Sequence, residues 1–284
     1  MIRKIFVPIR GDGKGETVLG YANALAQRFE AHVDATHCRP RAEDLNPFGV
    51  PIPAVMREQF VKQAKELADT EESRLRDEFD AIVKRFGLLI VDAPDGKGPS
   101  ISWSEESGKQ VDVIKGHGRL ADILVVAKPD RDRNLGANTL KAAIFNAGRP
   151  VLMCPPGPVP DLLGEHVAIA WNGSLEATRA VAQTLDVLKA ASKVTVLIAG
   201  AEEIHGATAA DLEAYLALHG VGVRLHRFDT SKRIGDALLE QTAAVGADML
   251  IMGAYSDSHE RETLFGGNTQ VVVDGAELPV ILVH

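Results

Sequence analysis

The stretch that decides the fold is ADMLIMGAYSDSHERETLFGGNT, from Ala247 to Thr269. Its apolar run, Met249 to Met252, is too short for a stable helix and is typical of a strand buried on both faces. Gly253 ends the run, a polar loop follows, and Gly266-Gly267 stand where the next helix should begin. Glycines let backbone N–H groups approach a ligand, and a helix N-terminus attracts anions. The stretch therefore predicts a strand, an anion-binding loop and a helix; the alternative is that its glycines are only turn residues.

An internal repeat surrounds this stretch and divides the chain into two related halves. Three segments of the first half resemble three of the second in the same order: 4–9 and 166–171, 121–127 and 247–253, and 149–153 and 278–282. Between the halves, the proline-rich segment 155–160 cannot continue a helix or a central strand. We expect one domain over residues 1–155 and another over 162–284.

Composition limits the function classes. The chain has 284 residues, 45% of them hydrophobic and 25% charged, which is typical of a globular protein of two domains. The formal net charge of -8 argues against nucleic-acid binding. No apolar run reaches the length of a membrane span, and the N-terminus lacks the apolar region of a signal peptide, so we expect a cytoplasmic protein without a membrane partner. Cys38 and Cys154 have no metal-binding spacing and are interpreted as small buried residues.

Each half alternates strands with helices. In the first half we expect strands at 4–9, 32–37, 87–91, 122–127 and 150–153, and helices near 15–29, 54–86, 107–118 and 138–147. In the second half we expect strands at 166–171, 193–199, 221–227, 248–252 and 279–283, and helices near 174–190, 208–219, 232–245 and 267–275, the first of them capped by Ser174. This alternation predicts α/β architecture: two repeated Rossmann-like domains, each a five-stranded parallel sheet with helices on both faces. Ligands of such sheets bind at the carboxyl ends of the strands, where the loops after strands one and four meet.

These features resemble the universal stress protein family in its tandem two-domain form, whose domains are of the adenine nucleotide alpha hydrolase-like type. The resemblance is carried mainly by HVAIAWNGSLEATRAV, by GADMLIMGAYSDSHERETLFGGNT and by the terminal LPVILVH. ATP-binding members have a glycine, two residues, a glycine, nine residues, and a glycine followed by a small polar residue. Gly253 and Gly266 fill the first and last places of this pattern, whereas Ser256 stands at the second glycine. The aspartate that usually holds the nucleoside is replaced by Asn172, which lacks the carboxylate charge.

The resemblance implies one adenine-nucleotide site, for ATP or AMP with or without Mg²⁺, in the second half. Its expected residues are Ala170, Trp171, Asn172 and Ala199 around the nucleoside, and Met252, Gly253, Ser256, Gly266, Gly267, Asn268 and Thr269 along the phosphates. In the first half, Ala127, Asp130, Ala137 and Asn138 are aligned with the glycine motif and Arg10 with Asn172. Because an acidic Asp130 would repel phosphates, we expect the first half to have lost the nucleotide site and to serve as a packing partner.

Other motifs give weaker evidence for a binding or catalytic site. The glycine-rich segment 11–17 follows a strand and opens a helix, but it matches neither the Walker spacing nor G-x-G-x-x-G; an anion site or a plain glycine turn is possible there. His259 and Arg261 could meet a phosphate tail or lie in solvent. No general base, catalytic residue or metal set is recognised, so an enzyme with fast turnover is not expected, although weak ATPase activity is left open.

The resulting hypothesis is a stress-response or regulatory protein that binds ATP or AMP in its second half. Its halves would pair within one chain, or chains would form a homodimer. The alternative from another class is a non-nucleotide scaffold of the same fold that acts through protein partners.

Overall fold

The computed structural model describes residues 1–39, 54–160, 163–200, 206–255 and 267–284. Within these ranges, eleven strands form one sheet in the order β3-β4-β2-β1-β5-β6-β11-β10-β7-β8-β9. The first half contributes β1 (Lys4–Ile9), β2 (His32–Arg39), β3 (Leu89–Ile90), β4 (Ser100–Ser107), β5 (Ile123–Ala127) and β6 (Val151–Cys154). The second half contributes β7 (His166–Ala170), β8 (Lys193–Ala199), β9 (Arg224–Phe228), β10 (Met249–Gly253) and β11 (Val280–Val283).

The two halves share one strand order. If each half is numbered by its long strands, both read third, second, first, fourth, fifth: β4-β2-β1-β5-β6 and β9-β8-β7-β10-β11. Every neighbouring pair within a half is parallel. The registers also agree, because Ile5 pairs with Ile123 as Val167 pairs with Met249. The expected α/β class and the repeat are thereby confirmed.

The halves join edge to edge through one antiparallel strand pair. β6 and β11 pair with Leu152 opposite Ile281, and this continues the sheet from one half into the other. The last strand, β11, therefore pairs across the junction between the halves.

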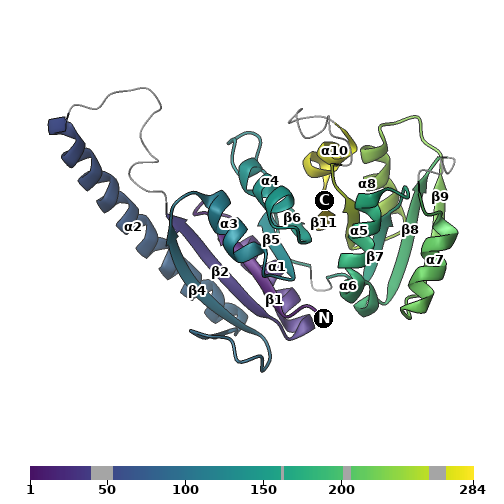
Figure 1. The fold of residues 1–284 in the computed structure, drawn as a ribbon, viewed down its shortest axis with the longest axis horizontal. Helices are drawn as coiled ribbons and strands as arrows, with labels where there is room; N and C mark the ends of the chain where they lie inside the picture. Colours follow the sequence, from purple (N-terminus) through teal and green to yellow (C-terminus); the bar gives the residue numbers. More distant parts are fainter. Residues whose placement is uncertain (40–53, 161–162, 201–205, 256–266) are drawn as a thin grey trace.

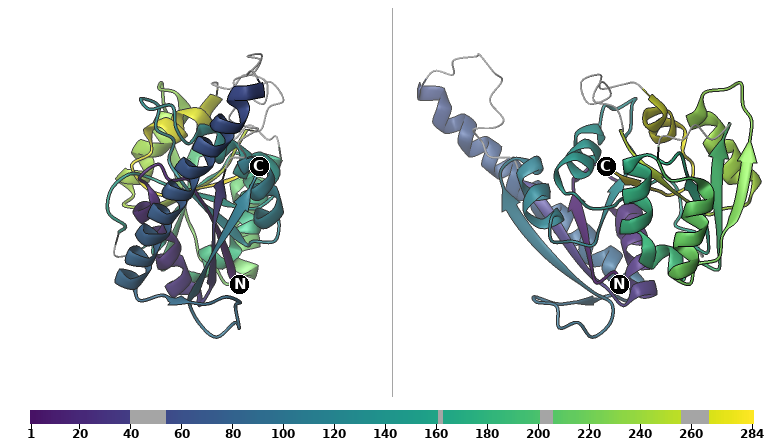
Figure 2. Two further views of the ribbon diagram at one scale, coloured as in Figure 1. Left: turned by 90° about the vertical axis from the view of Figure 1, so that its left-hand side faces the viewer. Right: turned by 45° about the vertical axis from the view of Figure 1, so that its right-hand side comes forward.

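Helices cover both faces of the sheet (Figure 1). One buried apolar cluster lies under five helices: α1 (Gly15–Phe29), α2 (Ala54–Phe86), α5 (Leu175–Gln183), α6 (Leu185–Ala190) and α7 (Ala209–Leu218). The other lies under four: α3 (Gln110–Gly118), α4 (Ala137–Asn146), α8 (Ile234–Ala244) and α10 (Gly267–Gly275). The N-terminal turns of α2 extend past the edge of the sheet in both figures that show the whole fold (Figures 1 and 2). No helix in the described ranges is both long and apolar enough to cross a bilayer.

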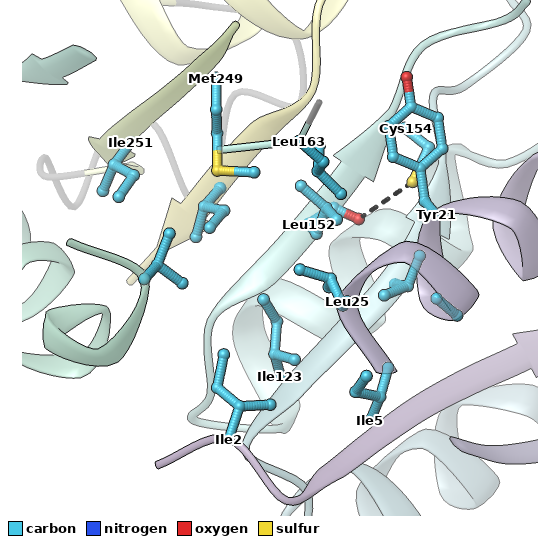
Figure 3. Close-up of a cluster of buried hydrophobic side chains, with 14 of the residues drawn as sticks. Ile2, Ile5, Tyr21, Leu25, Ile123, Leu152, Cys154, Leu163, Met249 and Ile251 are labelled. Atoms are coloured by element: carbon cyan, nitrogen blue, oxygen red, sulfur yellow. Dashed lines mark hydrogen bonds between the residues drawn. The ribbon is translucent and has the colours of Figure 1, made fainter. Parts of the chain in front are cut away.

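The core crosses the junction without interruption. Figure 3 shows one cluster that contains Leu152 and Ile123 of the first half together with Met249 and Ile251 of the second, all of them almost fully buried. Cys154 belongs to the same cluster and is 1% exposed, so it is a small buried residue as expected. Arg28 of α1 adds polar contacts, because its guanidinium donates to the carbonyl of Leu163 (2.8 Å) and pairs with Glu165 (2.6 Å).

The third strand of the first half was predicted in the wrong place. The segment 87–91 forms only the two-residue β3, whose Leu89 and Ile90 are exposed, and the long third strand is β4. β4 was not predicted as a strand because its sequence, SISWSEES, is polar: serines occupy alternate positions of one face, where they bond polar side chains of β2 such as His32 and Thr36. Trp103 of β4 packs 4.8 Å from the ring of Phe79.

The helix expected over 174–190 is two helices, α5 and α6. It begins as predicted, since the Ser174 hydroxyl accepts a hydrogen bond from the Ala177 N–H (3.2 Å). It breaks at Thr184, whose hydroxyl donates back to the Ala180 carbonyl (2.6 Å). A threonine that bonds in this way competes with the helical backbone.

Candidate functional site

The strand order creates one switch point in each half. In the second half it lies between β7 and β10. These two strands are adjacent and parallel in the sheet although they are not consecutive in the sequence. Their carboxyl ends bring Ala170 and Met252 to the same edge of the sheet, and β8 brings Ala199 there from the other side of β7. The structure therefore gathers these three predicted residues, and it is at such an edge that open α/β sheets bind ligands.

The loop after β7 contains Trp171 and Asn172. The Trp171 backbone N–H donates to the Leu197 carbonyl (3.0 Å), and its ring is only 6% exposed. Among the described residues, the buried indole N–H has no hydrogen-bond partner. The side-chain oxygen of Asn172 accepts from the Ser174 N–H (3.1 Å), so Asn172 shapes the turn that starts α5.

Gly253 is required by packing. A Cβ at this position would lie 2.6 Å from the Ala177 nitrogen and 2.6 Å from the Glu176 carbonyl carbon, both in the first turn of α5. The end of β10 thus touches the start of the helix that follows β7. This contact brings the N-terminus of α5 to the switch point.

The start of α10 is the described end of the segment that links β10 to α10. Gly267 has φ +87°, a backbone conformation that favours glycine, and Asn268 is exposed beside it. Thr269 is buried, and its hydroxyl accepts a hydrogen bond from the Tyr255 N–H (3.1 Å), so it ties the start of the loop to its end. Ser256 and Gly266, like His259 and Arg261, lie outside the described residues.

Three features of this site were not anticipated from the sequence. Tyr255 has φ +58° and begins the loop in the left-handed region. The loop after β7 also touches the loop that follows β8, because a Cβ on Gly206 would lie 2.1 Å from the Gly173 carbonyl oxygen. Glycines in both loops were the available signal, since only glycine permits such a backbone approach.

The third unanticipated feature is a motif shared by the halves. α4 and α10 begin at corresponding residues, and both starts read Gly-x-Asn-Thr, at 136–139 and 266–269. Gly136, rather than Ala137, is therefore the counterpart of Gly266, which corrects the sequence alignment by one residue. Asp130 closes the shorter loop of the first half by a two-way backbone pairing with Leu135 (2.8 and 2.9 Å).

No group of three or more histidine, cysteine, aspartate or glutamate side chains in the described ranges could hold a metal ion.

The fold and the switch-point loops define the class: a doubly wound α/β protein built from two repeats. Residues 165–284 match the model of the Universal stress protein family. The second half of the chain therefore belongs to that family. No curated protein matches the chain by sequence.

Solved structures show how far the likeness extends. A universal stress protein from Archaeoglobus fulgidus DSM 4304 matches 99% of this chain over 95% of its own, with a TM-score of 0.69 and 14% identity. A functionally unknown protein from Pseudomonas aeruginosa PAO1 matches 99% over 92% (TM-score 0.57, 17% identity), and a putative universal stress protein from P. aeruginosa UCBPP-PA14 matches 99% over 93% (TM-score 0.55, 16% identity). At these identities the likeness concerns the fold, and it covers both halves.

Proposed function

We propose that this chain is a stress-response or regulatory protein that binds ATP or AMP at the switch point of its second half and hydrolyses it slowly or not at all. The observation that carries the proposal is the meeting of three elements there: the end of β7, the end of β10, and the start of α10 with Gly267 at positive φ. The domain that contains them is the one that matches the universal stress protein family.

The chemistry of the described loops suits binding. The start of α10 is tied to the end of β10 by the Thr269 hydroxyl, and backbone N–H groups at a helix N-terminus favour phosphate. Asn172 offers an amide that can donate to and accept from a nucleoside. The orphan indole N–H of Trp171 supports a ligand or an ordered water near the end of β7, because buried donors are normally satisfied.

Slow turnover is part of the proposal. Efficient hydrolysis needs a positioned general base for the attacking water. The predicted site residues within the described ranges are apolar, glycine, amide or hydroxyl residues, of which none has a pKa near neutrality.

Calorimetric titration of the whole chain with ATP and with AMP, each with and without Mg²⁺, tests the proposal. We expect one site per chain, and loss of binding in Gly266→Glu, because the glutamate places bulk and negative charge where the phosphates would lie. Gly222→Glu is the matched control: it adds the same side chain at an exposed glycine with nothing within 4 Å of the new Cβ. Absence of binding in the wild type would overturn the nucleotide proposal and favour the scaffold of protein partners. If both variants lose nucleotide binding equally, the loss comes from the added negative charge and not from its position.

A further inference from the structure

The turn between β7 and α5 contains the single Asn-Gly pair of the sequence, Asn172-Gly173. The other asparagines are followed by alanine, proline, leucine or threonine. Asn172 is exposed, whereas Gly173 is buried. In an Asn-Gly pair the backbone nitrogen of the glycine has ready access to the side-chain amide, because the following residue has no Cβ to obstruct it. The pair is therefore chemically suited to deamidation of Asn172.

The turn folds the Asn172 amide back over the nitrogen that would attack it. The side-chain oxygen of Asn172 accepts a hydrogen bond from the Ser174 N–H (3.1 Å). The ring that this bond closes contains both the Asn172 Cγ atom and the Gly173 nitrogen, so it holds the two reacting atoms in one turn. Among the described residues, no backbone carbonyl accepts a hydrogen bond from the Gly173 N–H. The attacking nitrogen is thus not held by another backbone group of the described chain.

Both flanks of the turn are anchored. On one side, the Trp171 N–H donates to the Leu197 carbonyl (3.0 Å). On the other side, Ser174 caps α5, since its hydroxyl accepts a hydrogen bond from the Ala177 N–H (3.2 Å). The Ser174 N–H is therefore held against the Asn172 oxygen, where negative charge builds up during the attack, and a fixed donor at that place stabilises the charge. The N-terminus of α5 favours the same charge.

The fold also requires the glycine of the pair. Gly173 has φ +71°, a backbone conformation that favours glycine, and a Cβ at this position would lie 2.8 Å from the Ala207 carbonyl oxygen. A larger residue, which would slow the attack on Asn172, cannot be placed there unless Ala207 moves. The packing of the turn therefore maintains the reactive pair.

We propose that Asn172 is a site of spontaneous deamidation in the folded protein. The Gly173 nitrogen gives its proton to water or hydroxide and forms a bond to the Asn172 Cγ atom. The Cγ–Nδ2 bond then breaks and ammonia leaves, which gives a five-membered succinimide. Water opens this ring to aspartate or isoaspartate, so the net reaction consumes a water molecule and releases ammonia without any redox change.

The reaction is a slow, one-way change of charge at the switch point of the second half. The product carries a carboxylate in place of the neutral amide, just before the N-terminus of α5, where a negative charge is favoured. An aspartate oxygen can also keep the hydrogen bond from the Ser174 N–H, so we expect the aspartate product to remain folded. This inference does not depend on the proposed function.

Incubation of the whole chain near pH 6 and near pH 8.5, followed by mass mapping of tryptic peptides and by ion exchange, tests the proposal. In the peptide that ends at Arg179, fragment ions should place at Asn172 the mass difference between a hydroxyl and an amino group. The intact chain should gain a negative charge. Conversion should be about tenfold or more faster at the higher pH, because the attacking nitrogen must lose its proton.

Three comparisons serve as controls. Asn172→Gln should suppress the conversion, because glutamine would have to close a larger ring, and Asn172→Asp marks where the aspartate product elutes. Asn134 is the internal control: it is also exposed and in a turn, but Leu135 follows it, and the Leu135 N–H donates to the Asp130 carbonyl (2.9 Å). We expect Asn134 to stay unchanged while Asn172 converts.

The same chain unfolded in guanidinium chloride separates the effect of the turn from that of the dipeptide. Conversion of Asn172 in the folded protein at a rate equal to or above that of the unfolded chain would support the proposal. Conversion only in the unfolded chain would overturn it, because the folded turn would then shield the amide. Equal conversion of Asn134 and Asn172 in the folded protein would also overturn it, since the reaction would not select this turn.

Discussion

Leu152 lies opposite Ile281 in the antiparallel junction of β6 and β11, and the two residues are each other's counterparts in the sequence repeat. The adjacent pairs follow the same symmetry: Val280 lies opposite Met153, and Leu282 lies opposite Val151. A pseudo-two-fold axis therefore passes between Leu152 and Ile281, as in a self-complementary contact between two copies of one subunit. Both side chains are fully buried, so the junction is part of the core.

Truncation at this axis should weaken both halves together. Leu152→Ala and Ile281→Ala should each lower the free energy of unfolding by about 2–4 kcal/mol, because each leaves a cavity in a continuous core. Trp103 reports on the first half and Trp171 on the second, so urea unfolding of variants with one tryptophan each should show a single shared transition. Leu218→Ala, at a side chain that is 87% exposed, should change stability by less than about 0.5 kcal/mol. Separate transitions for the two tryptophans would contradict this shared core.

The fold was largely predictable because the buried strands, and with them the repeat, are recognisable as apolar runs in the sequence. β5, β7, β8 and β10 are hydrophobic almost throughout, as strands buried on both faces must be. β4 was missed for the opposite reason: it lies next to the short edge strand β3, and its serines satisfy polar side chains of the neighbouring β2. Such pairing between strands distant in sequence leaves no local pattern to detect.

Gly253 offers a direct test of packing at the switch point. Gly253→Ala should destabilise the protein by about 2–3 kcal/mol, since the new methyl group would collide with backbone atoms of α5 that cannot rotate away. Gly222→Ala is the control, because nothing lies within 4 Å of its new Cβ. Chemical denaturation without nucleotide measures both variants. A neutral Gly253→Ala would mean that the first turn of α5 yields easily.

The candidate site was predictable only in part. The residues at strand ends, such as Ala170 and Met252, follow from the strand order, and the start of α10 follows from its glycines. The role of Thr269 as a tie to the Tyr255 N–H could not be inferred, because it depends on how the loop closes.

His117 should make stability depend on pH. Its Nδ1 lies 3.1 Å from Asp34, its Nε2 lies 2.6 Å from Glu106, and its ring stacks on Phe6; Lys4 pairs with the same Asp34 oxygen. Burial opposes the charge on the ring, but the two carboxylates outweigh it and raise the pKa of His117. A raised pKa in the folded state stabilises the protein below the unfolded pKa of about 6.5, and this contribution is lost as the pH rises through the folded pKa.

His117→Gln removes this charge. It should therefore cost about 1 kcal/mol more near pH 5.5 than near pH 9, a modest difference because Glu106 is half exposed. Urea unfolding at the two pH values measures it, and His219→Gln, on a histidine that ends α7, is the control. A cost that is the same at both pH values would mean that the ring acts only by packing on Phe6.

Phe145, in the first half, contacts the residue at which the proposed nucleotide loop of the second half begins. Its ring, on α4, lies 5.0 Å from the ring of Tyr255 and 5.0 Å from that of His284. Tyr255 is the last described residue before the loop and is held by Thr269 at the loop's end. Phe145 therefore supports the residue from which the loop departs.

We expect Phe145→Ala to lower stability by about 1–2 kcal/mol, less than for a fully buried ring, and to weaken ATP binding about threefold or more because the loop loses its support. Leu120→Ala, at a side chain that is 77% exposed in the same half, is the control for both measurements. A double-mutant cycle with Tyr255→Leu should give a coupling of about 0.5–1.5 kcal/mol in stability if the rings interact directly. Unchanged ATP affinity with reduced stability would confine Phe145 to holding the halves together, since the loop would then keep its shape without it.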